Sequence, residues 1–151
     1  MADCENNLPY IVFYIFNYFC CTQIYTRMLR NKQGTALIFK DTHYSFENIL
    51  RHAGAYSKKI DHLHPEKVMI FSENRPEWIF AFYAAWNVSA TVVPADPMSS
   101  ASEIAYIAND SRPAVIYYSR EKETIVKEAL KTTNYNPELF LLDDLGHIEA
   151  D

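Results

Sequence analysis

The side chains best placed to act on a ligand are polar residues that directly follow four predicted strands. They are Glu73, Asn74 and Arg75 after strand 67–72, residues 96–100 after strand 90–93, Ser119 after strand 114–118, and Asp143 and Asp144 after strand 138–142. In an open parallel sheet, ligands usually bind in the crevice at the carboxyl ends of the strands. These residues do not make up a recognisable catalytic set. The sequence therefore assigns no catalytic, cofactor-binding or metal-binding residue.

Phosphate binding is the chemistry that the sequence argues against most specifically. A phosphate cradle normally uses a glycine-rich turn at a helix N-terminus, because the backbone amides must approach the anion closely. The three glycines, Gly34, Gly54 and Gly146, are isolated, and none lies between a predicted strand and the following helix. We therefore expect no phosphate loop of the common kinds.

Histidines and one aspartate are the remaining candidates for a ligand site. The histidines are His43, His52, His62, His64 and His147. His62 and His64 precede a proline at a predicted helix end, with no further zinc ligand at suitable spacing, which favours a solvated helix terminus over a metal site. Asp96 could face a ligand, but its position before Pro97 favours a role in fixing the turn.

Charge and cysteine content restrict the class of protein. The net charge of −5 does not supply the clustered cations that nucleic-acid binding needs. The cysteines Cys4, Cys20 and Cys21 form neither a disulfide framework nor a zinc spacing, which favours free thiols in a cytoplasmic protein. We therefore expect no nucleic-acid partner and a reducing compartment.

Residues 8–21 form an apolar, aromatic run that resembles a targeting sequence at first sight. Acidic Asp3 and Glu5 precede it, and it is shorter than the roughly 20 residues that span a bilayer. We predict a helix buried against protein. Because Arg27, Arg30 and Lys32 follow it, an interfacial membrane helix over residues 8–25 stays open as the alternative.

Apolar runs and helical periodicity predict the elements that position these side chains. A hairpin is expected from strand 36–40 and His43-Tyr44, followed by a helix at 46–60 that Ser45 caps and whose solvent side carries Arg51, His52, Lys58 and Lys59. Strands at 67–72, 90–93, 114–118 and 138–142 then alternate with helices. This order predicts an α/β fold with a parallel sheet and helices on both faces.

Capping signals mark where the helices between these strands begin. Asn74 and Glu77 have capping-box spacing with Pro76 in the first turn, and Ser100 pairs with Glu103 in the same way. Pro94 to Pro97 is expected to be a loop, residues 109–113 to break the second helix, and Ser119 to cap a helix at 120–131. A polar tail is expected from Asp143.

The helix at 78–86 has no polar face, so it must be covered on several sides. If the covering part is missing, this helix and the aromatic segment at 13–19 expose apolar patches beyond what a monomer usually tolerates. We therefore expect the isolated chain to self-associate through one of these surfaces.

Four segments in order resemble the N-terminal region of adenylate-forming (AMP-binding) enzymes, most of all the long-chain acyl-CoA synthetases. The segments are YSFENIL at 44–50, SENRPEW at 72–78, ATVVPADP at 90–97 and YIANDSRP at 106–113. The resemblance runs from about residue 36 to residue 118 and continues more weakly to 142. Ser89 stands where that family usually has glycine, so we expect another residue to form the tight turn there.

The resemblance implies a ligase that uses ATP, Mg²⁺ and CoA to convert a fatty acid to its acyl-CoA through an acyl-adenylate. The family's ATP loop, ribose-binding aspartate and catalytic lysine lie downstream of the matching region. We therefore expect a truncated N-terminal part without activity or cofactor of its own, with residues 1–35 as an aromatic helix and linker and residues 36–151 as the α/β subdomain. Its expected partners are the rest of the parent ligase and, for that parent, the fatty acid.

A free-standing flavodoxin-like binding or signalling module is the alternative from another class. A phosphoacceptor receiver would need paired acids after its first strand and an aspartate after its third. Glu73 and Ser119 fit that pattern poorly.

Overall fold

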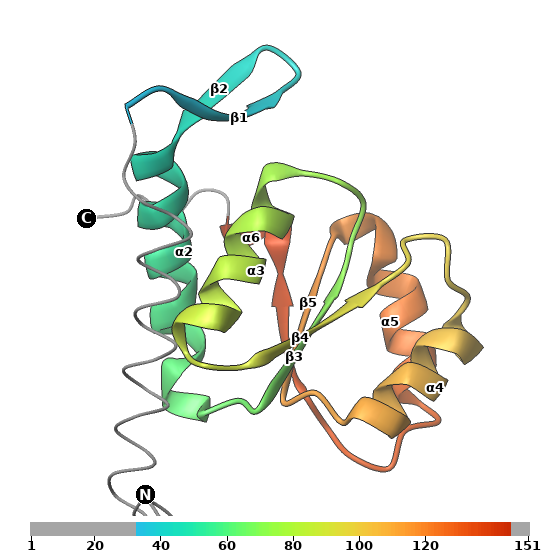
Figure 1. The fold of residues 1–151 in the computed structure, drawn as a ribbon. Coiled ribbons are helices and arrows are strands. Elements are labelled where there is room, and N and C mark those ends of the chain that lie inside the picture. The colour runs from blue at the N-terminus through green and yellow to red at the C-terminus, as the bar shows by residue number, and fades with distance from the viewer. Residues whose placement is uncertain (1–32, 146–151) are drawn as a thin grey trace, which may run out of the picture.

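The computed structural model describes residues 33–145 of the 151-residue chain. The predicted helix at 8–21, the interfacial alternative over residues 8–25, the three cysteines and His147 lie outside the described residues. The described part contains a small hairpin and a larger α/β unit (Figure 1).

A four-stranded parallel sheet forms the centre of the α/β unit, as the sequence predicts. Its strands are β3 (Lys67–Phe71), β4 (Thr91–Ala95), β5 (Val115–Tyr118) and β6 (Glu138–Leu141), in the spatial order β4-β3-β5-β6. The central strands β3 and β5 are buried on both faces, as continuous apolar runs require. Strands β4 and β6 form the two edges.

Helices cover both faces of this sheet (Figure 1). On one side lie α2 (Phe46–Ile60), α3 (Pro76–Asn87) and the short α6 (Leu142–Leu145), around a core that includes Tyr56 and Tyr117. On the other side lie α4 (Ala101–Ser111) and α5 (Glu123–Leu130), whose core includes Met69 and Ile104. The predicted fold class is confirmed, and the sheet separates two apolar cores.

The hairpin consists of β1 (Thr35–Phe39) and β2 (Thr42–Ser45), which pair antiparallel as predicted. Lys40 in its turn has a φ of 52°, in the left-handed region that tight hairpin turns need. Ser45 then caps α2, and its Oγ accepts a hydrogen bond from the Asn48 backbone N–H at 3.1 Å. The hairpin therefore continues directly into the first helix.

Two predicted caps, at Ser45 and Ser100, are confirmed, and two, at Asn74 and Ser119, are wrong. The Ser100–Glu103 capping box is present at the start of α4, with the Ser100 backbone N–H donating to Glu103 Oε2 at 2.7 Å. At α3 the N-cap residue is Arg75 and not Asn74, because Glu77 binds the Arg75 guanidinium instead. The Ser119 side chain makes no capping hydrogen bond either. A 3₁₀ helix, η2 (Arg120–Lys122), precedes a shorter α5, and the Ser119 hydroxyl binds Glu73.

Three predicted boundaries also differ from the structure. Pro94 and Ala95 belong to β4 and not to a loop, and an edge strand tolerates proline because one side of it needs no partner. Helix α4 continues through residues 109–111 and ends at Ser111, and the C-cap residue Arg112 has a φ of 48°. Asp143 and Asp144 lie in α6 rather than in a tail.

Ser89 forms the turn between α3 and β4 itself, with a φ of 61°. The expectation that another residue makes this turn is therefore wrong. A serine in the left-handed region carries a local conformational cost that glycine avoids.

Candidate functional site

The folded chain brings together the side chains that follow β3, β5 and β6. Arg75 is at the centre, with its Nε donating to Glu77 Oε2 at 2.8 Å and an Nη donating to Asp143 Oδ2 at 3.2 Å and to Glu73 Oε1 at 3.4 Å. Its side chain is only 17% exposed. The backbone N–H of Arg120 also donates to Asp143 Oδ2, at 2.9 Å. We call Glu73, Arg75, Glu77, Ser119 and Asp143 the strand-end cluster.

One hydrogen bond of this cluster crosses the point where ligands would be expected. All four strands are parallel, but the order of the strands changes side at β3. The next strand in sequence, β4, lies on one side of β3, whereas β5 and β6 lie on the other, so the switch point is between β3 and β5. At that point the Ser119 hydroxyl donates to Glu73 Oε2 at 2.7 Å. The crevice between these two strands is therefore bridged by the protein's own side chains.

The cluster stabilises the charged forms of its members. Burial raises the pKa of Glu73, but the hydrogen bond from Ser119 and the charge of Arg75 outweigh burial and leave that pKa below its ordinary value. Burial likewise raises the pKa of Asp143, and its hydrogen bonds from Arg120 and Arg75 reverse the direction. The pKa of Arg75 is raised by Glu77 and Asp143 against the effect of burial. Carboxylates held ionised in this way are poor general acids or bases near neutral pH.

An open cavity of about 350 Å³ adjoins the cluster on the side of the hairpin. The residues that line it are Phe39, Lys40, Tyr44, Glu73, Asn74, Arg75, Pro76, Glu77 and Glu121. Its lining therefore carries three carboxylates against two cations, and Arg75 is already paired with two of those carboxylates. Such a surface does not suit a triphosphate, which needs unpaired cations and forward-pointing amides.

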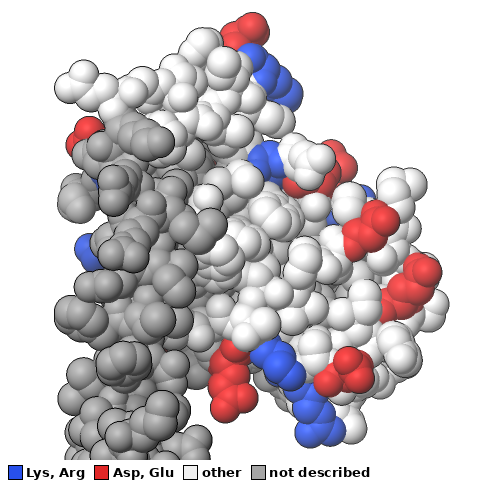
Figure 2. Space-filling view, viewed as in Figure 1, with Lys and Arg blue, Asp and Glu red and all other residues white. Residues whose placement is uncertain are grey.

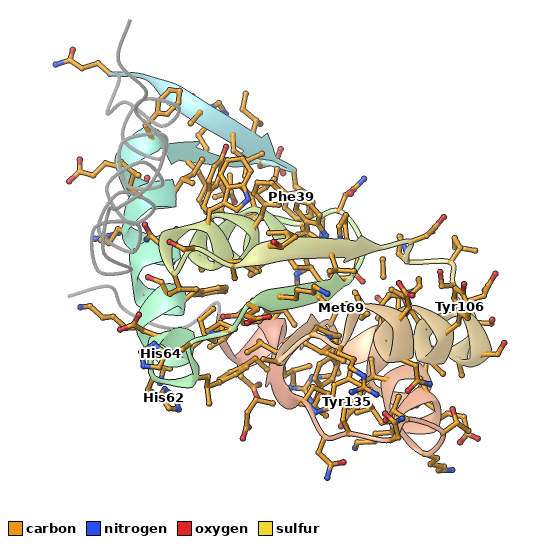
Figure 3. The ribbon with its side chains drawn as sticks, turned by 60° about the horizontal axis from the view of Figure 1, so that its bottom comes forward. Phe39, His62, His64, Met69, Tyr106 and Tyr135 are labelled. Carbon is orange, nitrogen blue, oxygen red and sulfur yellow. The ribbon has the colours of Figure 1, made fainter. Side chains whose placement is uncertain are left out.

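The other predicted candidates lie apart from the cluster. Asp96 accepts a hydrogen bond from the Met98 backbone N–H at 2.8 Å, so it fixes the turn after β4. Asp144 pairs with Arg120 at 3.0 Å on the surface. His62 lies in η1 (Asp61–Leu63) and His64 directly after it, at the far end of α2 from the hairpin (Figure 3). Among residues 33–145, no group of three or more His, Cys, Asp or Glu side chains could hold a metal ion.

Sequence reasoning missed the role of Glu77 and placed His52 on the wrong side of its helix. Glu77 was expected to cap α3, although its spacing from Arg75 also permits the ion pair that forms. His52 was expected to face solvent, but its ring stacks on Phe80 of α3 with a centroid distance of 4.5 Å. Burial, with the charge of Arg51, lowers the pKa of His52 despite an opposing effect of Glu77.

Apolar side chains dominate one part of the surface. Trp78, Phe82 and Trp86 form a partly exposed stripe along α3, with ring centroids 5.5 Å and 4.7 Å apart. Figure 2 shows that the middle of the corresponding face lacks charged side chains, which gather above it and along its margins. None of the helices described is both long enough and apolar enough to cross a bilayer.

Comparison with known proteins identifies the family. The sequence-family model described as AMP-binding enzyme matches residues 25–148 of this chain. A 4-hydroxybutyrate–CoA ligase from Metallosphaera sedula is 29% identical over 122 residues, which cover 75% of this chain and 21% of that protein.

Solved structures of CoA ligases share the fold. An anthranilate CoA ligase in complex with anthranoyl-AMP superposes with a TM-score of 0.73 at 18% identity, covering 87% of this chain and 28% of that one. A benzoate CoA ligase from Burkholderia xenovorans gives 0.69 at 16% identity, covering 83% and 27%. The chain thus spans less than a third of the length of these relatives. Because the family match includes most of its residues, the chain belongs to the AMP-binding enzyme family.

Proposed function

We propose that this chain is the N-terminal scaffold of an AMP-dependent acyl-CoA synthetase and is inactive alone. The parent would join a fatty acid to CoA, releasing AMP and pyrophosphate from ATP through an acyl-adenylate. In this proposal, residues 36–151 form the α/β subdomain and residues 1–35 an aromatic helix and linker. The rest of the ligase would be its main partner, in the cytoplasm.

The strand-end cluster is the observation that carries this proposal. The default ligand position of the sheet is bridged by Glu73 and Ser119, and the guanidinium of Arg75 is paired with carboxylates. The described residues do not fit ATP or a Mg²⁺–triphosphate complex, so we derive no chemical step from them. What this arrangement supports is a rigid platform that joins three strand ends.

ATP–pyrophosphate exchange tests the proposal. The chain alone, offered short-chain and long-chain fatty acids with Mg²⁺, should give no exchange above the buffer level. The same chain, substituted for the matching segment of the Metallosphaera ligase, should support exchange, because the host would supply the remaining residues. The controls are the unmodified host and the host without that segment.

Two results would refute the proposal. One is exchange by the chain alone, and the other is a folded chimera, with the helical content of the host, that gives no exchange. In the full-length parent, the fatty acid that gives the most ATP–pyrophosphate exchange would identify its substrate class.

The flavodoxin-like alternative keeps one specific observation in its favour. The order β4-β3-β5-β6 corresponds to the first four strands of that doubly wound order. A free-standing module of this kind should bind a ligand between β3 and β5. Binding of a flavin or nucleotide by the chain alone in calorimetry would favour it over the scaffold.

Peripheral membrane contact through residues 8–25 is a further proposal about partners. Flotation with anionic liposomes should then require that segment. Equal flotation of the chain with and without residues 8–25 would contradict it.

A further inference from the structure

The two edges of the sheet differ in whether another strand can pair with them. In β4 the Thr91 backbone N–H donates to the Glu66 carbonyl of the neighbouring strand region at 2.8 Å. Because main-chain groups alternate along a strand, Val92 and Pro94 direct theirs away from the sheet. Pro94 has no N–H to offer, so β4 is a protected edge.

The opposite edge, β6, lacks such protection. Glu138 donates its backbone N–H to the Ala114 carbonyl at 2.9 Å, so Glu138 and Phe140 face β5. By the same alternation, Leu139 and Leu141 direct their main-chain groups outward. No other strand of residues 33–145 pairs with this side, and the strand contains neither proline nor lysine.

We propose that the outer edge of β6 pairs antiparallel with β6 of a second copy of this chain. This inference concerns the chain itself and does not depend on the proposed ligase function. Pairing Leu139 with Leu141 of the partner subunit uses all four outward main-chain groups of each copy. Phe140 then lies opposite Phe140 of the partner subunit, at a position without main-chain hydrogen bonds where side chains approach closely.

Side-chain chemistry supports this register. Positions 139, 140 and 141 are all apolar, so no like charges face each other across the twofold axis. Phe140 is partly buried, with its ring 5.6 Å from that of Tyr117, and is held on one face of the sheet. A second aromatic ring from the partner would extend this packing on the same face.

The difference between the edges also limits the size of the assembly. If both edges were open, β6 of one copy could pair with β4 of the next, and such head-to-tail contacts can grow into filaments. Pro94 disfavours that contact. Pairing of β6 with itself is isologous, so it closes at a dimer.

Sedimentation velocity over a range of concentrations tests the pairing. The chain should show a reversible monomer–dimer equilibrium, and Leu139→Pro, which removes two hydrogen bonds per dimer, should raise the dissociation constant by about thirtyfold. The matched control is Val92→Pro, which removes an outward N–H from β4 and should leave dimerisation unchanged. Far-UV circular dichroism checks that both variants fold.

A cross-link keeps the inference testable if Leu139→Pro fails to fold. In a chain with the three native cysteines replaced by serine, Phe140→Cys should give a disulfide-linked dimer under mild oxidation, because opposed Cα atoms at such a position lie about 4.5 Å apart. Val92→Cys in the same background should not. A monomer at every concentration would overturn the inference. A dimer that Leu139→Pro leaves intact would also overturn it, and would point to the aromatic stripe of α3 or the segment at 13–19 as the contact.

Discussion

At the scale of single residues, Arg75 is the group on which the carboxyl edge of the sheet depends. It holds Glu73, Glu77 and Asp143 together from a largely buried position. Removing one partner of a buried ion pair leaves the other charges uncompensated. Arg75→Leu should therefore lower the free energy of unfolding by about 3 kcal/mol in urea denaturation.

Arg120→Leu provides the comparison for this prediction. Its guanidinium pairs with Asp144 on the surface, where the two side chains are 61% and 71% exposed, and its backbone N–H stays in place. Exposed pairs contribute less than about 1 kcal/mol. If the two substitutions cost the same, the strand-end cluster does not stabilise the fold as described.

His52 makes stability depend on pH. Its pKa in the folded chain is below the ordinary value of 6.5, mainly because of burial against α3. The unfolded chain therefore takes up this proton at a higher pH than the folded chain does, and stability falls as the pH drops through 6.5. His52→Gln should lose less stability than the parent chain between about pH 8 and pH 5.5.

Urea titrations at several pH values measure this difference. At pH 8 the imidazole is neutral in both states, so any change there reports the loss of stacking on Phe80 and serves as the baseline. Glu73 and Asp143, whose pKa values are depressed, weaken the fold at still lower pH in both proteins. Identical pH profiles for the parent and His52→Gln would contradict the assigned role.

At the scale of elements, α2 contains a replaceable residue. Gly54 lies in the interior of this helix, and, apart from its chain neighbours and the adjacent backbone of the helix itself, no described atom lies within 4 Å of the position that a Cβ would occupy. Alanine in place of an interior helical glycine reduces the entropy lost on folding. Gly54→Ala should raise the free energy of unfolding by about 0.5–1 kcal/mol.

Gly34→Ala is the matched control for this substitution. Gly34 also has open space around it, but its φ of 120° is a conformation that alanine rarely adopts. Gly34→Ala should therefore destabilise the chain, and thermal unfolding should show this as a lower midpoint. Stabilisation by both substitutions, or by neither, would show that backbone conformation does not decide the outcome.

The elements that sequence predicts best are those with a strong local signal. The apolar runs of β3 and β5 and the serine caps at Ser45 and Ser100 identify their elements directly. Pro94 was misassigned because proline indicates a loop locally, whereas a sheet edge accommodates it. Whether a strand is at an edge depends on tertiary structure, which local pattern does not contain.

The candidate site was only partly predictable, for the same reason. Its residues follow the strands as expected, but the partners chosen depend on long-range geometry. Ser119 binds Glu73, 46 positions away, and Arg75 binds Asp143, 68 positions away. Ser119 had a reasonable local role as a cap and Asp143 as the start of a polar tail, but in the folded structure both bind distant segments instead.

At the scale of the whole molecule, the two sides of the sheet differ in the apolar side chains that they expose. The α4–α5 side leaves Tyr106 75% exposed and pointing away from α4 (Figure 3), whereas the α2–α3 side has the aromatic stripe. In the proposed function, the aromatic stripe is the uncharged surface that would meet the rest of the ligase. The β6 edge adds a directional contact, since strand pairing requires one register.

The aromatic stripe also gives the molecule an intrinsic optical probe. Both tryptophans of the chain, Trp78 and Trp86, lie on α3, two turns apart and on the same face. The wavelength of tryptophan fluorescence therefore reports how far this one helix is exposed to water. Binding of another polypeptide over α3 should shift the tryptophan emission to the blue. Binding on the opposite face of the sheet should leave the spectrum nearly unaltered.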